Sequence, residues 1–202
     1  MMLYQIRQAT NPRRVIIYLA EKDIDIPRYE VNAAANEHKS AAFLALNPAG
    51  KVPVLALDDG TALSESAAIV EYLEECHPNP PMIGTTPAQR ARVRALERIG
   101  NDLIVRSQLW LMHSHAFFSG HVQQHAEVAK LAQAFALELL TTLEQRIGDN
   151  KFLAGGHPSI ADCTLFALFQ TCRTRLQIPL GEDQPRLNHW YLRFSERPSA
   201  AY

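Results

Sequence analysis

Apolar and polar positions along the first third of the chain follow two periods. Alternation over residues 3–6 indicates a short strand, and apolar residues spaced along one face indicate a helix over 12–22. That helix is predicted to begin at Asn11 and Pro12, because Asn is a favoured N-cap and proline fits the first helical position. A second strand is predicted at 28–31. Since a helix separates the two strands, they should be parallel and joined by a right-handed crossover.

The pattern up to residue 77 completes a small α/β domain. Residues 40–46 are weakly helical, and 51–57 read as a strand interrupted by a proline. The Asp-Asp-Gly sequence at 58–60 is a hairpin signal, because glycine accepts the positive φ of tight turns. A returning antiparallel strand is expected at 61–63 and a helix at 67–75. The predicted order is β-α-β-α-β-β-α.

The remainder of the chain is predicted to be an all-helical bundle. Prolines 78, 80, 81 and 87 are too dense for a helix or a central strand, so residues 78–87 are predicted to be a linker. Ser159 and Asp162 have capping-box spacing, and the following residues are apolar nearly all round, which predicts a central buried helix. Helical periodicity covers about 87–118, 124–147, 159–175 and 184–196. We therefore expect domains at 1–77 and 88–202.

Charge and cysteine content narrow the function classes. Twenty Lys and Arg against 21 Asp and Glu give a formal charge of -1, so no global field points to nucleic acid or a membrane surface. The three cysteines form no C-x-x-C and are predicted to be reduced, mostly buried thiols of a cytoplasmic protein. The N-terminus lacks a signal-peptide block, and no run approaches the roughly 18 apolar residues of a membrane span.

A proline inside the predicted strand at 51–57 needs an explanation, because in a central strand it removes a ladder hydrogen bond. One possibility places the strand at the sheet edge, where Pro53 costs nothing. The second makes the Val52–Pro53 bond cis, which turns the backbone N–H and C=O of Val52 outward to pair with an extended ligand. The motif alone favours neither.

Glu65 and Ser66 precede a helix, where free backbone N–H groups and the helix dipole attract an anion. Ser66 adds a hydroxyl donor and Glu65 the opposite charge, so the pair could hold the carboxylate and the ammonium group of an amino acid. The alternative is that Ser64 or Ser66 only caps the helix and Glu65 is an acid of its first turn.

Together these motifs resemble the glutathione S-transferase family, and the resemblance extends over nearly the whole chain through the proline-rich linker and the Ser159-x-x-Asp162 box. It implies a thioredoxin-like domain followed by a helical one, a homodimer, and a role in detoxification. The residues that carry it are Asn47-Pro48-x-Gly50-Lys51-Val52-Pro53-x-Leu55 and Glu65-Ser66-x-Ala68-Ile69-x-x-Tyr72-Leu73.

The resemblance also implies which residues bind glutathione. Val52 would pair with the cysteinyl backbone across cis-Pro53, while Glu65 and Ser66 would hold the γ-glutamyl end. His38 and Lys51 match positions that contact the glycyl end in theta-like members, and both side chains suit a carboxylate. For His38 a solvated helix residue is the alternative.

The group that ionises the thiol is the point where the chain departs from the family pattern. Family members place Tyr, Ser, Cys or Asn near the start of the first helix, and this chain has Gln8-Ala9-Thr10-Asn11-Pro12. Thr10 and Asn11 are the catalytic candidates, with Thr10 slightly favoured because Asn11 could be an N-cap. Tyr4, on the first strand, is expected to be a core residue.

A second substrate, expected to be a hydrophobic electrophile, should lie against the helix that follows the linker. Helical spacing places Arg106, Trp110 and His113 on one face of it, although Trp110 could equally serve core packing. The pair His121 and His125 has the i, i+4 spacing of a metal clip, but no acidic or Cys partner is near, so no metal is expected.

Three functions fit these observations. The first is a glutathione transferase that activates the bound thiol for attack on an electrophile or for reduction of a peroxide. The second is a non-catalytic binding or regulatory protein of the same fold, which the weak catalytic position favours. The third is a glutathione-dependent isomerase, although the Ser-Ser-Cys motif of zeta-like members is missing.

Overall fold

The computed structural model describes residues 1–201, and the chain divides into two compact units. The first comprises Met1–Met82 together with the C-terminal segment that starts at Glu196, and the second comprises Ile83–Ser195. Sequence periodicity assigns all of 88–202 to the helical domain, whereas the final segment packs with the first unit. Residue 202 lies outside the described residues.

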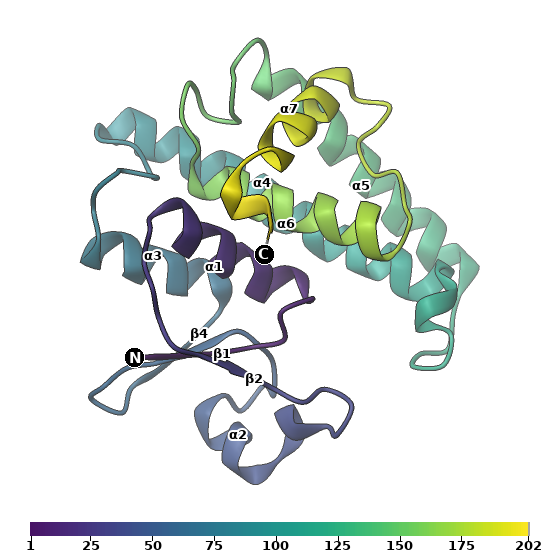
Figure 1. The fold of residues 1–202 in the computed structure, drawn as a ribbon. Coiled ribbons are helices and arrows are strands. Elements are labelled where there is room, and N and C mark those ends of the chain that lie inside the picture. Colours follow the sequence, from purple (N-terminus) through teal and green to yellow (C-terminus); the bar gives the residue numbers. More distant parts are fainter. Residues whose placement is uncertain (202) are drawn as a thin grey trace. The chain divides into compact units, whose positions relative to one another are not determined.

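The first unit is a four-stranded mixed sheet with helices on both faces (Figure 1). The sheet order is β2-β1-β3-β4; β1 and β2 are parallel, and β3 is antiparallel to both β1 and β4. Helices α1 and α3 lie on one face of the sheet and α2 on the other. The elements are β1 (Met2–Gln5), α1 (Thr10–Glu21), β2 (Arg28–Glu30), the 3-10 turn η1 (Glu37–Lys39), α2 (Ala41–Leu46), β3 (Val54–Ala56), β4 (Ala62–Ser64) and α3 (Ser66–Cys76). This is the predicted element order, with the predicted parallel pair.

Helix α1 begins earlier than the sequence suggests. Its N-cap position is Ala9 and its first residue is Thr10, so the prediction that Asn11 caps the helix is wrong. Pro12 then stands third in the helix, where its missing N–H would have had no intrahelical acceptor in any case. The proline is compatible with either start, and only the backbone geometry distinguishes them.

A buried ion pair joins the end of α1 to α3 and to the segment after it. The side chains of Lys22 and Glu74 are 0% and 2% exposed, with Nζ and Oε2 2.8 Å apart. Glu74 also accepts hydrogen bonds from the Tyr18 hydroxyl at 2.6 Å and from the Met82 N–H at 2.7 Å. Lys22 donates to the carbonyl of Pro80 at 2.6 Å. Each buried charge therefore has the additional partners that its burial requires.

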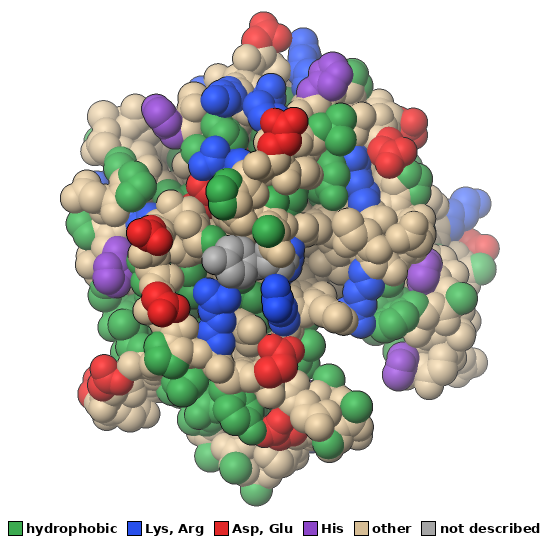
Figure 2. All heavy atoms as spheres, in the orientation of Figure 1, with side chains coloured by type: hydrophobic (Ala, Val, Ile, Leu, Met, Phe, Trp, Pro, Cys, Tyr) green, Lys and Arg blue, Asp and Glu red, His purple; other side chains and the backbone are tan. Residues whose placement is uncertain are grey.

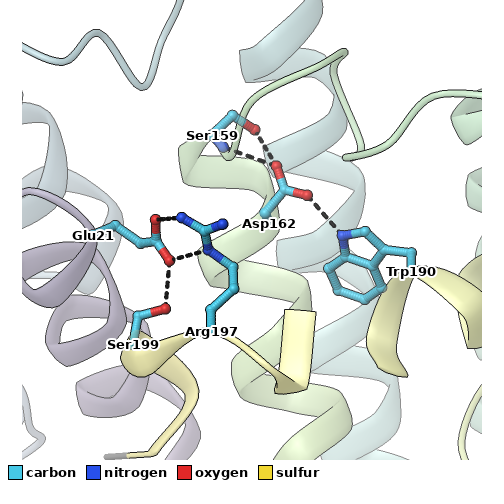
Figure 3. Close-up of polar contacts among 6 residues, drawn as sticks. All are labelled: Glu21, Ser159, Asp162, Trp190, Arg197 and Ser199. Atoms are coloured by element: carbon cyan, nitrogen blue, oxygen red, sulfur yellow. Dashed lines mark hydrogen bonds and ion pairs between the residues drawn. The ribbon is translucent and has the colours of Figure 1, made fainter. Parts of the chain in front are cut away.

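The C-terminal segment is held against α1 by a second polar cluster, shown in Figure 3. The guanidinium of Arg197 donates to the two carboxylate oxygens of Glu21 at 2.6 and 2.7 Å, and the Ser199 hydroxyl also donates to Glu21. The guanidinium of Arg13 donates to the carbonyl of Ala200, which lies in the 3-10 turn η4 (Pro198–Ala201). Because of these contacts, the last residues belong to the first unit.

The second unit is built from helices. Thr86 and Gln89 form a capping box at the start of α4, a signal that fixes its first residue at Pro87. The predicted helix over 159–175 is an α-helix that continues into a π-helical turn. The elements are α4 (Pro87–Ser114), the 3-10 turn η2 (Ala116–Phe118), α5 (Ala126–Ile147), α6 (Ile160–Gln170), the π-helical turn η3 (Thr171–Arg175) and α7 (Pro185–Ser195).

Helix α6 is the centre of the second unit, as its sequence predicts: every residue from 160 to 169 is buried. Asp162, 0% exposed, organises the start of this helix (Figure 3). Its Oδ2 accepts from the N–H and the hydroxyl of Ser159, and its Oδ1 accepts from the Leu153 N–H and from Nε1 of Trp190 at 2.8 Å. One carboxylate thus joins the preceding loop, α6 and α7.

Acidic and basic side chains are both present on the face of the molecule shown in Figure 2. Among residues 1–201, no helix is long and apolar enough to cross a membrane.

Replacing the carboxylate of Asp162 by a carboxamide should destabilise the protein. In Asp162→Asn the new NH2 group faces at least one buried N–H donor in either amide orientation, so we expect a loss of about 2 kcal/mol in the free energy of unfolding. Glu144→Gln is the matched control, because Glu144 accepts the N–H groups of Arg186 and Leu187 at a more exposed site. Urea denaturation measures both losses, and equal losses would contradict the central role of Asp162.

Candidate functional site

The peptide bond between Val52 and Pro53 is cis, as one of the two sequence hypotheses requires. The edge-strand hypothesis is wrong, because β3 lies between β1 and β4 in the sheet. Pro53 stands just before Val54, the first residue of β3, which pairs with Tyr4 and Ser64. A central strand can therefore follow the proline without losing a ladder hydrogen bond.

The backbone of Val52 is open to an external partner. No hydrogen bond joins its N–H or C=O to any residue within 1–201. Its side chain, in contrast, packs against the cluster formed by Val31, Phe43 and Val54. Tyr4 packs against the same cluster, in agreement with its predicted core role. The side chain of Val52 thus fixes the position of its unpaired N–H and C=O groups, and an extended ligand can form backbone hydrogen bonds with such groups.

Asn47 shapes the loop that leads to Val52. It is 6% exposed, its Nδ2 donates to the carbonyl of Lys51 at 2.8 Å, and its Oδ1 accepts from the Ala49 N–H at 3.1 Å. Gly50 has φ +58, and a Cβ there would lie 2.8 Å from the carbonyl oxygen of His38. The side chain of Asn47 and the absence of one at Gly50 therefore set the path of residues 47–52 together.

Glu65 is the N-cap residue of α3 and has φ 68 and ψ 112, a conformation that costs a non-glycine residue energy. No side chain caps the helix, so the hypothesis that Ser64 or Ser66 serves as its cap is wrong. In the described structure the N–H groups of residues 66–68 have no hydrogen-bond partner, while the N–H of Ile69 bonds to the Glu65 carbonyl. Ser66 is 6% exposed. The start of α3 therefore presents free N–H groups, of the kind that attract anions, next to the residue Glu65.

His38 and Lys51 lie on the segments that flank the 47–52 loop. His38 is half-buried in η1, and its Nδ1 is buried without a hydrogen-bond partner among the described residues. The turn is held by Glu37, which accepts from the Tyr29 hydroxyl and the Asn32 N–H, both at 2.6 Å. These hydrogen bonds, the Tyr29 bond first, hold the pKa of Glu37 below its ordinary value. Lys51 is exposed.

Thr10 and Asn11 are the first two residues of α1, so both stand at its positive dipole end. Thr10 is 8% exposed. Asn11 is half-buried, and within the described part of the chain its amide makes no hydrogen bond. Because Asn11 is not the N-cap, its side chain is not used to close its own helix.

Arg106, Trp110 and His113 all lie on α4 at the predicted spacing, within the second unit. The guanidinium of Arg106 lies 5.3 Å from the ring centroid of the exposed Phe135 on α5. Trp110 is half-buried, and the Nδ1 of His113 accepts the His125 N–H at 3.2 Å. Their role in a pocket stays a prediction.

The histidines of the second unit form no metal site that the described residues reveal. His125 contacts His113, with ring centroids 5.6 Å apart, whereas His121 contacts Phe117. No group of three or more His, Cys, Asp or Glu side chains within 1–201 could hold a metal ion.

Comparison with known proteins identifies the family. The N-terminal domain model of the glutathione S-transferases matches residues 10–76, and the C-terminal domain model matches residues 107–198. The chain belongs to the glutathione S-transferase family. The predicted fold, a thioredoxin-like α/β domain followed by a helical domain, is confirmed.

Relatives with different names match over most of the chain. A maleylacetoacetate isomerase of Pseudomonas aeruginosa is 35% identical over 82% of this chain and 78% of its own. Glutathione S-transferase 2 of Saccharomyces cerevisiae is 31% identical over 98% of this chain and 87% of its own. The crystal structure of Gtt2 from Saccharomyces cerevisiae superposes with a TM-score of 0.87 at 29% identity, covering 100% of this chain and 99% of that one.

Sequence reasoning missed two features of the first unit. The side-chain role of Asn47 could have been found, because Asn before Pro in an Asn-Pro-x-Gly stretch is typical of a turn that the side chain closes. A cavity lined by Gln5, Arg7 and Glu30 had no such signal. Those residues meet only because β1 and β2 are neighbours in register.

Adding a methyl group at Gly50 should displace the loop before Val52. Gly50→Ala imposes an L-residue on φ +58 and also brings Cβ against the His38 carbonyl. Gly60→Ala is the control, because Gly60, in the hairpin turn, has φ +88 and nothing within 4 Å of its Cβ position. We expect the control to lose about 1 kcal/mol of stability and Gly50→Ala to lose clearly more. Denaturant unfolding of both variants measures this, and losses of equal size would contradict the steric argument.

Proposed function

We propose that this chain is a glutathione transferase, in which Val52, Pro53, Glu65 and Ser66 bind glutathione and Thr10 or Asn11 helps to ionise its thiol. The observation that carries the proposal is the joint presence, in the first unit of a family member, of an unpaired Val52 backbone and an open N-terminus of α3. Either feature alone would also suit an ordinary loop or helix start that binds no ligand.

Each part of glutathione has a chemical counterpart in the first unit. The cysteinyl backbone offers one N–H and one C=O, which suit the unpaired groups of Val52. The γ-glutamyl end carries a carboxylate, for the N–H groups and hydroxyl at Ser66, and an ammonium group, for Glu65. The glycyl carboxylate suits the charge of Lys51. The Nδ1 of His38, which has no hydrogen-bond partner among the described residues, could donate a hydrogen bond to the same carboxylate.

The reaction requires a thiolate. A thiol with pKa near 8.5 is only about 3% ionised at neutral pH, and lowering the pKa by two units needs roughly 2.7 kcal/mol of preferential stabilisation. A hydroxyl or amide donor supplies part of this, and the dipole of α1 adds to it. The buried protein thiol Cys172 is no substitute, because burial raises its pKa to about 12.

Activation of the thiol leads to transfer or reduction. In conjugation the sulfur forms a bond to an electrophilic carbon, the leaving group departs with its electron pair, and the thiol proton passes to solvent.

We further propose a hydrophobic electrophile near Arg106, Trp110 and His113, a homodimer, and a cytoplasmic location with a role in detoxification. The position of these three residues on α4 supports only the statement that they share one face of the helix.

A glutathione-dependent isomerase is a second candidate. It is favoured by the maleylacetoacetate isomerase of Pseudomonas aeruginosa, 35% identical to this chain. A transferase consumes glutathione, whereas an isomerase returns it unchanged. The amount of free thiol after many turnovers therefore distinguishes the two.

Removal of the Ser66 hydroxyl should weaken glutathione binding. In Ser66→Ala one donor to the γ-glutamyl carboxylate is lost, which corresponds to about a tenfold increase in Kd. Thr141→Ala is the control, because that hydroxyl bonds to its own helix at the Leu137 carbonyl. Isothermal calorimetry with glutathione measures both. No binding by the unmodified protein would overturn the proposed function.

Thr10 and Asn11 can be separated by titrating the bound thiol. The two variants are Thr10→Val and Asn11→Ala. Substitution of the residue that contacts the sulfur should raise the pKa of the bound thiol toward 8.5 and lower turnover at least about tenfold. Glutathione affinity should be preserved, since the binding groups are elsewhere. Ultraviolet absorbance of the thiolate reports the pKa. Unchanged turnover and an unchanged thiol pKa in both variants would contradict a catalytic role for either residue, whereas no turnover by the unmodified protein would favour a non-catalytic protein.

A further inference from the structure

A cavity of about 870 Å³ opens where β1 and β2 end, within the first unit. It is lined by the β1–α1 connection on one side and by β2 with the residues after it on the other. The size suits a small organic ligand. Ile6 and Val31 give it an apolar wall, while Arg7, Arg28 and Glu30 give it charge. Two arginines and one glutamate leave the lining with one excess positive charge.

The carboxylate of Glu30, which carries the negative charge of this lining, already accepts two hydrogen bonds. Glu30 Oε2 accepts from Nε2 of Gln5 at 3.2 Å, and its Oε1 accepts from the backbone N–H of Arg7 at 2.8 Å. Gln5 is 5% exposed, so it holds the carboxylate from the protein interior. These bonds also fix the backbone of Arg7 at the edge of the cavity.

The guanidinium of Arg7, in contrast, makes no hydrogen bond with the described residues. The side chain is exposed and lines the cavity, and no hydrogen bond or ion pair joins it to any residue in the described part of the chain. Only the backbone N–H of Arg7, and not its side chain, is bonded to Glu30. A guanidinium presents parallel N–H donors that match a carboxylate in bidentate geometry.

We propose that Arg7 binds a carboxylate of the second substrate in this cavity, so that the enzyme acts on electrophiles that carry an acid group. The inference rests on the proposed transferase function. It departs from a purely hydrophobic electrophile near Arg106, Trp110 and His113, because the unpaired guanidinium of Arg7 offers an acid group a bidentate partner that those residues of the other unit are not shown to offer.

The position of the cavity agrees with this role. Sheet order places β2 at the opposite edge from β4, so the cavity lies on the side of β1 away from Val52, Glu65 and Ser66, which adjoin β3 and the end of β4. The β1–α1 connection is shared: it runs from Arg7 to Thr10, the start of α1. A sulfur held near Thr10 or Asn11 and a carboxylate held by Arg7 would thus approach the same connection from its two sides.

Two electrophiles that react by the same chemistry test the proposal. With 4-chloro-3,5-dinitrobenzoate or its carboxamide, the glutathione sulfur bonds to the ring carbon, chloride leaves with the electron pair, and the thiol proton goes to solvent. Arg7→Gln should lower kcat/KM for the benzoate about tenfold and change that for the benzamide less than about twofold. Arg7→Lys, which keeps the charge, should retain part of the preference.

The matched control is Arg146→Gln, which removes the same charge from an exposed position of α5 in the other unit. The intrinsic reactivities of the two electrophiles cancel when the benzoate-to-benzamide ratio is compared between variants. A ratio that falls equally in Arg7→Gln and Arg146→Gln, or in neither, overturns the proposal.

A binding measurement keeps this result separate from the transferase proposal. Calorimetry with 3,5-dinitrobenzoate, which has no leaving group, tests the cavity even if neither electrophile is conjugated. Binding that weakens about tenfold in Arg7→Gln and not in Arg146→Gln supports the carboxylate site on its own. No binding by the unmodified protein, or binding that the Arg7 substitution leaves unchanged, overturns it.

Discussion

The path of the chain into β3 is the constraint on which the candidate site depends. β3 is an inner strand, so its ladder hydrogen bonds must begin after Pro53, which cannot donate one. The segment before it is consequently left outside the sheet: among the described residues the N–H and C=O of Val52 are unpaired, while its side chain remains anchored in the core. Asn47 and Gly50 hold that segment in place. The requirement of the fold thus leaves unpaired, at Val52, the backbone groups that the proposed glutathione site would use.

The same relation between fold and ligand recurs at the start of α3. Helix starts are usually closed by a side chain, and here Glu65 takes the N-cap position with positive φ and no capping bond. The local energy that this costs is offset by the packing of α3, whose buried residues include Ile69, Val70 and Leu73. The structure therefore keeps three N–H groups available where a ligand carboxylate could complete the helix.

Most of the fold could be predicted from the sequence, because its elements carry strong local signals. The parallel pair followed from the helix between two strands, and the central position of α6 followed from its apolar surface. The start of α1 could not be predicted, since Pro12 is acceptable at either the first or the third helical position. The docking of residues from Glu196 on the first unit depends on the pairing of Arg197 with Glu21, 176 positions apart, for which no periodicity exists.

The candidate site shows the same division between local and non-local information. Groups that would bind glutathione lie in two short segments whose motifs are contiguous, so they were recognisable together. Arg7 gains its proposed role only from register: Glu30 faces it because β1 and β2 are parallel neighbours in which Gln5 pairs with Glu30. Binding by backbone groups of Val52 and of the start of α3 tolerates many side chains, whereas choice of the second substrate depends on single side chains. A chain that kept these backbone groups could therefore keep one ligand while single side-chain changes altered what it acts on.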